Sequence, residues 1–343
     1  MAYISFQPSD YFNTKLYTGN GSTQSITGVG FQPDWVWIKN RSSAYSHQAY
    51  DAVRGSTKKL LVDGVDAEAT DANGLTSFDS DGFSLGTNIG VNENTSNHVA
   101  WNWLANGSGS SNSDGSISST VSANTTSGFS IVKWTGSGAN ATIGHGLGAV
   151  PKWIWVKSLN NTTWHMIYHV GTGNDSELGL NSTNAASASS TAWQDTDPTT
   201  SVFYVGGSAG DGVNYSGDYV AYCFAEKKGF SKFGSYTGNG NADGTFVYTG
   251  FKPAFVMVKK SSASGDNWSI LDNKRNTFNV MDKYLDPNSS NAEGTADIWD
   301  FTSNGFKMRN TFSGYNASGA TFIFMAFAEH PLVSSNDIPA TAR

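Results

Sequence analysis

Short segments rich in aromatic and β-branched residues recur along the whole chain, separated by clusters of Gly, Ser, Asn and Thr. Some of these segments are apolar at every position, as in 35–38 and 322–328, whereas 82–86 alternates between apolar and polar residues. A strand that is apolar on both sides is buried on both faces, and an alternating strand keeps one face in water. The pattern therefore predicts an all-β protein of many short strands with few helices.

The same succession of strands occurs three times. Each copy has a Thr-Gly-x-Gly turn, then a proline and an aromatic-aliphatic strand that ends in a lysine. These lysines, Lys39, Lys157 and Lys259, lie a domain's length apart, whereas solenoid and propeller repeats have periods of about 20 to 50 residues. The matching segments are 17–21 with 31–39, 134–138 with 150–157, and 236–240 with 251–259.

This repeat predicts three tandem β-sandwich domains of the jelly-roll or lectin-like type. The segment between the first two copies is rich in Gly, Ser and Asn, which is typical of a flexible linker. The second and third copies follow each other with almost no spacer. The expected parts are an N-terminal extension at 1–12, sandwiches at 13–105, 126–228 and 229–330, a linker at 106–125, and a polar C-terminal tail at 331–343.

Composition and charge exclude several classes of function. The net charge of −7 argues against a protein that neutralises phosphates, so we expect no nucleic-acid partner. A single cysteine, Cys223, allows neither an intrachain disulfide nor a Cys-based zinc site. The N-terminal residues do not resemble a signal peptide, and the longest apolar run, 322–328, is too short to cross a bilayer. We expect synthesis in a cytoplasm and no membrane insertion.

Two groups of residues resemble catalytic or metal-binding motifs. The pattern G-x-S-x-G occurs at Ser84 and Ser208, but the first lies in an alternating strand and the second in a glycine-rich loop with no helical pattern after it. His165 and His169 are four residues apart in a predicted strand, where they share a face for structural reasons. His145 is interpreted as a loop histidine with a backbone hydrogen bond. We assign no catalytic residue and no protein-based metal site.

Acidic residues leave two alternatives open. Asp79 and Asp81 resemble the opening of a calcium loop, although the rest of the EF-hand spacing is missing and an Asx-turn explains them more simply. Glu226 and Glu329 end equivalent strands, where a charge discourages edge pairing. Two carboxylates from distant strands could also converge for glycoside cleavage, so a glycan depolymerase stays an alternative.

The eleven tryptophans raise the hypothesis of carbohydrate stacking. Trp35 and Trp37 belong to the predicted central strand, where packing in the core is expected. Trp193 and Trp299 come from loop-rich segments and are the candidates for exposed glycan platforms.

Four stretches of the chain resemble a family of uncharacterised phage proteins that is common in viruses of marine bacteria. These stretches are 12–21, 30–39, 222–226 and 338–343, and the resemblance covers nearly the whole chain. It implies a virion-associated structural protein of the tail or fibre type, with lectin-like or laminin-G-like sandwiches. It brings no catalytic residues.

These observations favour a non-enzymatic protein on the exterior of a phage particle, as a tail fibre or tail-associated module that recognises a host surface glycan. Loops at the ends of sandwiches can vary without disturbing the core, which is where binding residues are expected. The alternative is a capsid decoration or head-fibre protein. Expected partners are other virion proteins of the tail or capsid, a host glycan and further copies of the same chain.

Overall fold

The computed structural model describes residues 6–333 and contains almost entirely β-structure, with strands β1 to β27. The helical elements of this part are one 3-10 turn, η1 (Pro8–Asp10), and two single-turn helices, α1 (Ile89–Asn92) and α2 (Ser313–Asn316). All the strand pairs of the sheets are antiparallel. The all-β sandwich architecture that the hydrophobic pattern predicts is confirmed. None of the helices in residues 6–333 has the length and apolar character needed to cross a membrane.

Unit 1, the first repeat, has a six-stranded inner sheet in the order β1-β9-β3-β4-β5-β6 and a three-stranded outer sheet in the order β2-β8-β7. The inner strands are β1 (Phe12–Thr18), β3 (Trp35–Asn40), β4 (Gln48–Asp51), β5 (Lys58–Leu61), β6 (Ala69–Thr70) and β9 (Asn97–Trp103). The outer strands are β2 (Gln24–Thr27), β7 (Leu75–Asp79) and β8 (Gly82–Leu85).

Unit 2 has an eight-stranded inner sheet in the order β10-β11-β12-β19-β14-β15-β16-β17, and β13 pairs with β18 outside it. The inner strands are β10 (Ser110–Asn112), β11 (Ser119–Asn124), β12 (Phe129–Thr135), β14 (Pro151–Ser158), β15 (Met166–His169), β16 (Ser176–Gly179), β17 (Ser187–Ala188) and β19 (Asp218–Ala225). The outer strands are β13 (Ala141–Gly144) and β18 (Val202–Val205).

Unit 3 has two four-stranded sheets, in the orders β20-β27-β22-β23 and β21-β26-β25-β24. The inner strands are β20 (Ser231–Thr237), β22 (Phe251–Lys260), β23 (Ser269–Asp272) and β27 (Thr321–Pro331). The outer strands are β21 (Phe246–Tyr248), β24 (Met281–Tyr284), β25 (Gly294–Thr302) and β26 (Gly305–Met308).

The three units share one register between their central strands. Trp37 of β3 lies opposite Trp101 of β9, and Trp155 of β14 lies opposite Tyr222 of β19. Met257 of β22 lies opposite Met325 of β27 in the same way. In each unit, the strand at the repeated proline therefore pairs with the last strand of that unit, and the register of the pair is the same in all three units.

The two apolar faces of these central strands pack against different partners. Val36 and Ile38 point into the core between the two sheets of unit 1. Trp35 and Trp37 point the other way, into a core that contains residues from all three units. A strand buried on both faces was expected inside a sandwich; here the second buried face comes from packing between units.

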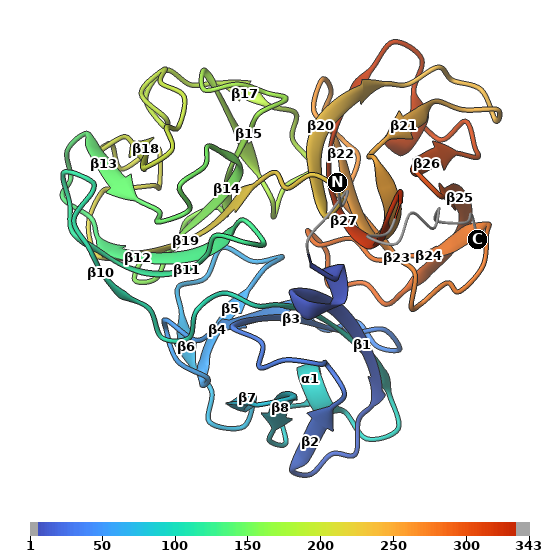
Figure 1. Ribbon diagram of the computed structural model, residues 1–343, viewed down its shortest axis with the longest axis horizontal. Helices are drawn as coiled ribbons and strands as arrows, with labels where there is room; N and C mark the ends of the chain where they lie inside the picture. The colour runs from blue at the N-terminus through green and yellow to red at the C-terminus, as the bar shows by residue number, and fades with distance from the viewer. Residues whose placement is uncertain (1–5, 334–343) are drawn as a thin grey trace.

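This central core holds the units together around one centre, and Figure 1 shows the three lobes arranged about it. Trp35 of unit 1 stacks on Tyr222 of unit 2, with ring centroids 4.5 Å apart. Trp101 meets Phe255 of unit 3 edge-on at 5.8 Å. Aromatic pairs of this kind contribute beyond the area that they bury. The units thus fold as one body with shared as well as separate cores.

The repeated lysines connect the units in a ring. Lys39 of unit 1 donates to the carbonyl of Ser290 in unit 3, at 3.0 Å. Lys157 of unit 2 donates to the carbonyl of Val65 in unit 1, at 2.9 Å. Lys259 of unit 3 completes the ring by donating to a carbonyl of unit 2, that of Thr183, at 3.2 Å. The three units therefore share the same lysine contact with a neighbouring unit, in addition to the same fold.

The segment 106–125 is not a flexible linker. It contains β10 and β11, which extend the inner sheet of unit 2 because β11 pairs with β12 along Thr120–Asn124. Val121 and Ser122 are buried there. The segment has few apolar side chains, but its backbone groups are satisfied by the strand ladder. The polar composition was therefore misleading.

The terminal predictions are tested only in part. In the predicted extension 1–12, Phe12 lies in the central core, and Phe6 and Tyr11 pack against that core. Residues 1–5 lie outside the described part. The predicted tail 331–343 lies outside it from residue 334 onward.

Candidate functional site

All eleven tryptophans lie within the described residues, and ten of them are buried. The other, Trp164, exposes 42% of its full accessible area. Trp193 and Trp299, the predicted exposed platforms, are 2% and 0% exposed, so that prediction is wrong. The segments that carry them fold over their own units. Trp193 packs edge-on against Tyr168 and donates its indole N–H to the carbonyl of Ser176, while Trp299 is part of β25.

Trp164 forms one wall of an open pocket on unit 2, which we call the rim pocket. Its volume is about 290 Å³. Trp164 stands two residues before β15, and its ring covers Gly179, where an added Cβ would lie 3.0 Å from the ring. The residues that line the rim pocket are Thr162, Thr163, Trp164, Met166, Glu177, Ala209, Gly210, Asp211 and Gly212.

Two carboxylates face the rim pocket. Burial raises the pKa of Glu177; the hydroxyl of Ser189 opposes the rise, and the charge of Asp211 adds to it. Asp211 is only 6% exposed, and its Oδ1 accepts a 2.7 Å hydrogen bond from the hydroxyl of Thr191. Its Oδ2 has no hydrogen-bond partner among the described residues. That oxygen is itself buried next to Gly206, where an added Cβ would lie 2.8 Å from it, so it does not open into the pocket.

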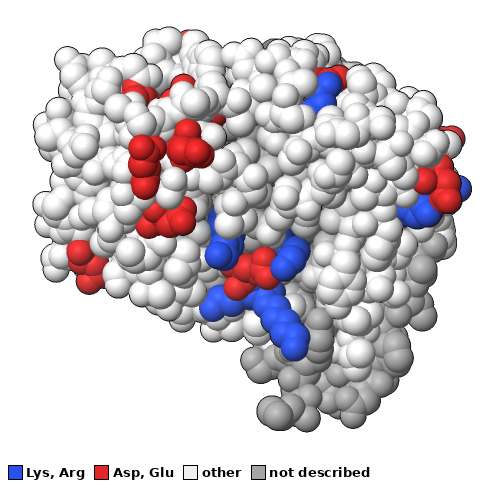
Figure 2. All heavy atoms as spheres, turned by 90° about the horizontal axis from the view of Figure 1, so that it is seen from above, with Lys and Arg blue, Asp and Glu red and all other residues white. Residues whose placement is uncertain are grey.

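The surroundings of the rim pocket are acidic. The sequence has no Lys or Arg between Lys157 and Lys227, while six Asp and Glu residues lie in 171–218 alone. Figure 2 shows acidic side chains on the left of the face, the side of unit 2, with no Lys or Arg among them. Lys157 lies next to the pocket, but its ammonium donates to the carbonyls of Val65 and Thr163.

In unit 1, paired side chains occupy the corresponding position. Gln48, which corresponds to Met166, accepts a hydrogen bond from Tyr50 and donates to Asn88. Lys59, which corresponds to Glu177, is paired with Asp71 at 3.0 Å. The polar side chains at this position therefore bond to one another, and the acid there is neutralised by a lysine.

Unit 3 has a smaller pocket of about 150 Å³ at the corresponding position. Tyr284 stands where unit 2 has Glu177, and the half-exposed ring of Phe312 lies at its edge. Asp286 at its base accepts hydrogen bonds from Ser269 and Asn267, both at 2.8 Å. Both carboxylate oxygens of Asp286 are therefore already occupied.

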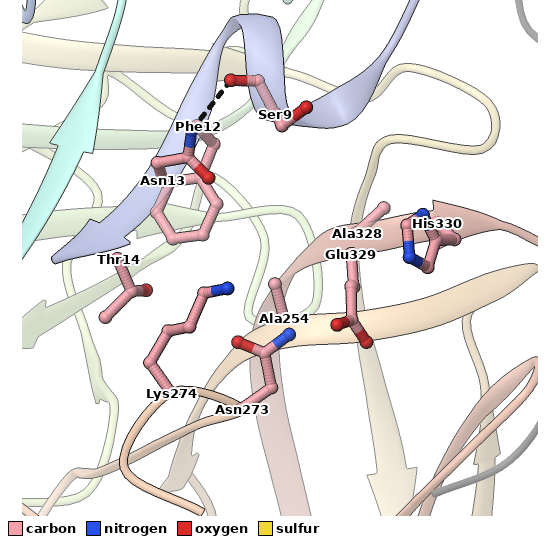
Figure 3. Close-up of a pocket in the computed structure, with 10 residues that line it drawn as sticks. All are labelled: Ser9, Phe12, Asn13, Thr14, Ala254, Asn273, Lys274, Ala328, Glu329 and His330. Carbon is pink, nitrogen blue, oxygen red and sulfur yellow. Dashed lines mark hydrogen bonds between the residues drawn. The ribbon is translucent and has the colours of Figure 1, made fainter. Parts of the chain in front are cut away.

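A further pocket, of about 200 Å³, lies at the seam between units 1 and 3 (Figure 3). The side chains of Lys274 and Asn273 point toward its centre from the loop after β23, with Thr14 of β1 on one side and Glu329 of β27 on the other. Its aromatic rings are that of Phe12, which belongs to the central core, and the exposed imidazole of His330. An indole offers a larger face for stacking on a sugar than this imidazole does, so the rim pocket with Trp164 is the stronger candidate.

The two serines of the G-x-S-x-G pattern make local hydrogen bonds. Ser84 lies on β8 and donates to the carboxylate of Asp79 at 2.7 Å. Ser208 lies in an exposed loop before Asp211.

The three histidines that we singled out are buried and hydrogen-bonded. His165 accepts the indole N–H of Trp155 at 2.9 Å. His169 contacts the carbonyl of Phe324 across the seam at 3.1 Å. His145 lies 3.2 Å from the carbonyl of Thr199, as interpreted from the sequence.

The remaining acidic candidates are engaged in local contacts. Asp79 accepts from the hydroxyls of Ser77 and Ser84, and Asp81 accepts the backbone N–H groups of Gly28 and Gly30. Glu226 and Glu329 pair with lysines, Lys232 at 2.8 Å and Lys252 at 3.5 Å. Within residues 6–333, His, Cys, Asp and Glu form no group of three or more suited to a metal ion.

Sequence reasoning missed Trp164, Glu177 and Asp211. A signal for Trp164 was present in the repeat itself, because Ser46 and Asn267 stand at its position in units 1 and 3. A tryptophan that replaces polar residues at an outward position is a better candidate for a platform than one in a loop-rich segment.

The residues along all three units match a single family model, at 7–331. The chain belongs to the family described as Domain of unknown function (DUF7483). The match spans the central core and the rim pocket, so the three repeats together make up the unit that the family defines. Neither the curated proteins nor the solved structures contain a match.

Proposed function

We propose that this protein is a non-enzymatic glycan-binding module on the exterior of a bacteriophage virion, in a tail fibre or tail-associated position. The observation that carries the glycan-binding part is the exposed ring of Trp164 at the wall of an open pocket with two carboxylates. The virion location rests on the resemblance of the repeat to phage proteins.

The chemistry of the rim pocket suits a sugar. An indole face packs against the apolar C–H face of a pyranose ring, and carboxylate oxygens accept hydrogen bonds from its hydroxyl groups. Pockets that bind small ligands combine an apolar wall with a few polar groups in this way. Trp164 supplies the wall, and Glu177 and Asp211 supply the acceptors.

A glycan array with the purified protein tests this proposal. We expect Trp164→Ala to lose the binding that the wild type shows. Phe246→Ala is the matched control, because Phe246 is similarly exposed, at 44%, but lies on β21 of unit 3. Wild-type protein should also block adsorption of the phage to its host. Equal glycan binding by wild type and Trp164→Ala would contradict the proposal.

Experiments with the same purified protein and phage particles also distinguish two other functions from this one. A glycan depolymerase would shorten the polysaccharide that binds, which product analysis detects; the carboxylates of Glu177 and Asp211 are the pair to examine. A capsid decoration protein would be found on the head in labelled particles and would need no ligand at the rim pocket.

A further inference from the structure

We infer that the rim pocket selects glycans that carry a positively charged amine, as in amino sugars. This inference rests on the proposed function, since it names the class of sugar that the same site would take. It depends on three features of the pocket: its unbalanced charge, the accessible carboxylate of Glu177 and the exposed ring of Trp164.

Among residues 6–333, no lysine or arginine forms a salt bridge with the carboxylates of the rim pocket. The salt bridges of the described residues include neither Glu177 nor Asp211. The two carboxylates act on each other, and the polar contacts of Glu177 are with the hydroxyls of Ser187 and Ser189. Like charges held together in a partly buried site favour a cation between or beside them.

The accessible carboxylate makes the requirement more specific. Glu177 is half-buried, whereas Asp211 is only 6% exposed and is held in place by Thr191, so Glu177 is the carboxylate that a ligand can reach directly. An ammonium group offers three N–H donors, and a hydrogen bond between ionised groups is roughly twice as strong as one between neutral groups. A sugar hydroxyl can occupy the same place, but it makes the weaker bond.

The ring of Trp164 favours the same kind of ligand. A cation near an indole face is attracted by the ring's negative face, in addition to the stacking of the sugar ring. Conversely, uronic acids, sialic acids and sulfated sugars would bring a third negative charge to Glu177 and Asp211. Such repulsion gives selectivity by rejecting the wrong ligand.

The other units lack this combination. Unit 1 neutralises its own acid, because Lys59 pairs with Asp71. Unit 3 has Tyr284 in place of Glu177, and both oxygens of Asp286 are hydrogen-bonded. Amine selectivity is therefore assigned to unit 2 alone.

The test compares glucosamine oligomers with N-acetylglucosamine oligomers of the same length, which differ in the charge at one position of each sugar. Calorimetric titration is done below the pKa of the amine. We expect wild type to bind the charged oligomer about tenfold or more tightly than the acetylated one. Glu177→Gln and Asp211→Asn should each reduce that ratio several-fold, since they keep the shape of the side chain and remove the charge.

Controls keep a folding defect apart from a binding defect. The half-buried Glu177→Gln variant should unfold like wild type, so it tests the inference even if Asp211→Asn is unstable. Lys59→Met, at the corresponding position of unit 1, should leave the binding ratio unchanged.

The outcomes separate the two proposals. Equal affinity for both oligomers, lost together in Trp164→Ala, would overturn amine selectivity and leave glycan binding intact. Absence of binding to any glycan would overturn both. Tight binding of Ca²⁺ that depends on Glu177 and Asp211, without any preference for the amine, would overturn the inference and make the pocket a cation site.

Discussion

The hydroxyl of Tyr222 in unit 2 donates a 2.8 Å hydrogen bond to the carboxylate of Asp51 in unit 1. Both residues are fully buried. Unit 1 makes the corresponding contact with unit 3, where the indole N–H of Trp101 donates to Asp272 at 3.1 Å. The contacts between units thus obey the same repeat as the strands within them.

Tyr222→Phe should destabilise the whole molecule. The substitution removes the donor to Asp51 and leaves that buried carboxylate with one partner fewer, which costs about 1 to 3 kcal/mol. Because the unit cores meet in the central core, unfolding should stay a single transition with a lower midpoint. Denaturant unfolding followed by tryptophan fluorescence measures this. Tyr248→Phe, at a half-exposed position on β21, is the control and should change little.

Stability should rise as the pH is raised above about 8, through the buried lysines of the ring. Burial lowers the pKa values of Lys39, Lys157 and Lys259 to about 8. Above that pH the folded protein has released the protons of these lysines, whereas the unfolded chain still binds them. The free energy of unfolding therefore rises with pH until the lysines of the unfolded chain also lose their protons, at about pH 10.4.

Urea unfolding at several pH values between about 8 and 10.4 measures the free energy of unfolding and its rise with pH. In the Lys157→Met variant this rise should be smaller than in wild type. An identical pH dependence in the two proteins would show that Lys157 keeps its proton in the folded state.

The buried and exposed tryptophans should differ sharply in their effect on stability. Trp193→Ala and Trp299→Ala each leave a cavity in a unit core and should cost about 3 to 5 kcal/mol. Trp164→Ala should cost far less, because 42% of its accessible area is exposed in the folded protein. Thermal unfolding of the three variants distinguishes these cases. A large loss in Trp164→Ala would mean that its ring holds the fold and is not reserved for a ligand.

The repeated Thr-Gly-x-Gly turn should depend on a buried asparagine. In unit 1, Asn92 accepts the backbone N–H of Asn20 and donates to the carbonyls of Ser22 and Gly86. Asn92→Ala should therefore loosen this turn and cost about 2 kcal/mol. Hydrogen exchange at the Asn20 amide should accelerate, while the corresponding amide of Asn239 in unit 3, held by Asn316, should stay protected.

The strands and their threefold repetition could be predicted from the sequence, because apolar runs after each proline specify strands in any context. What covers their second face could not be predicted. The apolar pattern indicates that Trp35 and Trp37 are buried. It does not reveal whether the residues that cover them belong to the same sandwich or to a neighbouring unit.

The candidate site was predicted less well. Trp193 was judged by its loop-rich surroundings, yet loops that fold over a sheet bury their aromatic rings as strands do. The rim pocket combines Trp164 with Glu177 and with Asp211 from a distant loop, and no spacing along the chain indicates that these meet. The prediction of a flexible linker at 106–125 was wrong for a related reason. A strand at the border of a sheet needs backbone partners more than apolar side chains.

Building the ring of three lobes from one chain has an evolutionary consequence. In an assembly of three identical subunits, every mutation appears three times, so a change that opens a pocket in one lobe opens it in all. Here the three lobes are encoded separately, and each can acquire or lose a ligand without altering the other two. The position occupied by Lys59, Glu177 and Tyr284 in the three lobes is an example of such independent divergence.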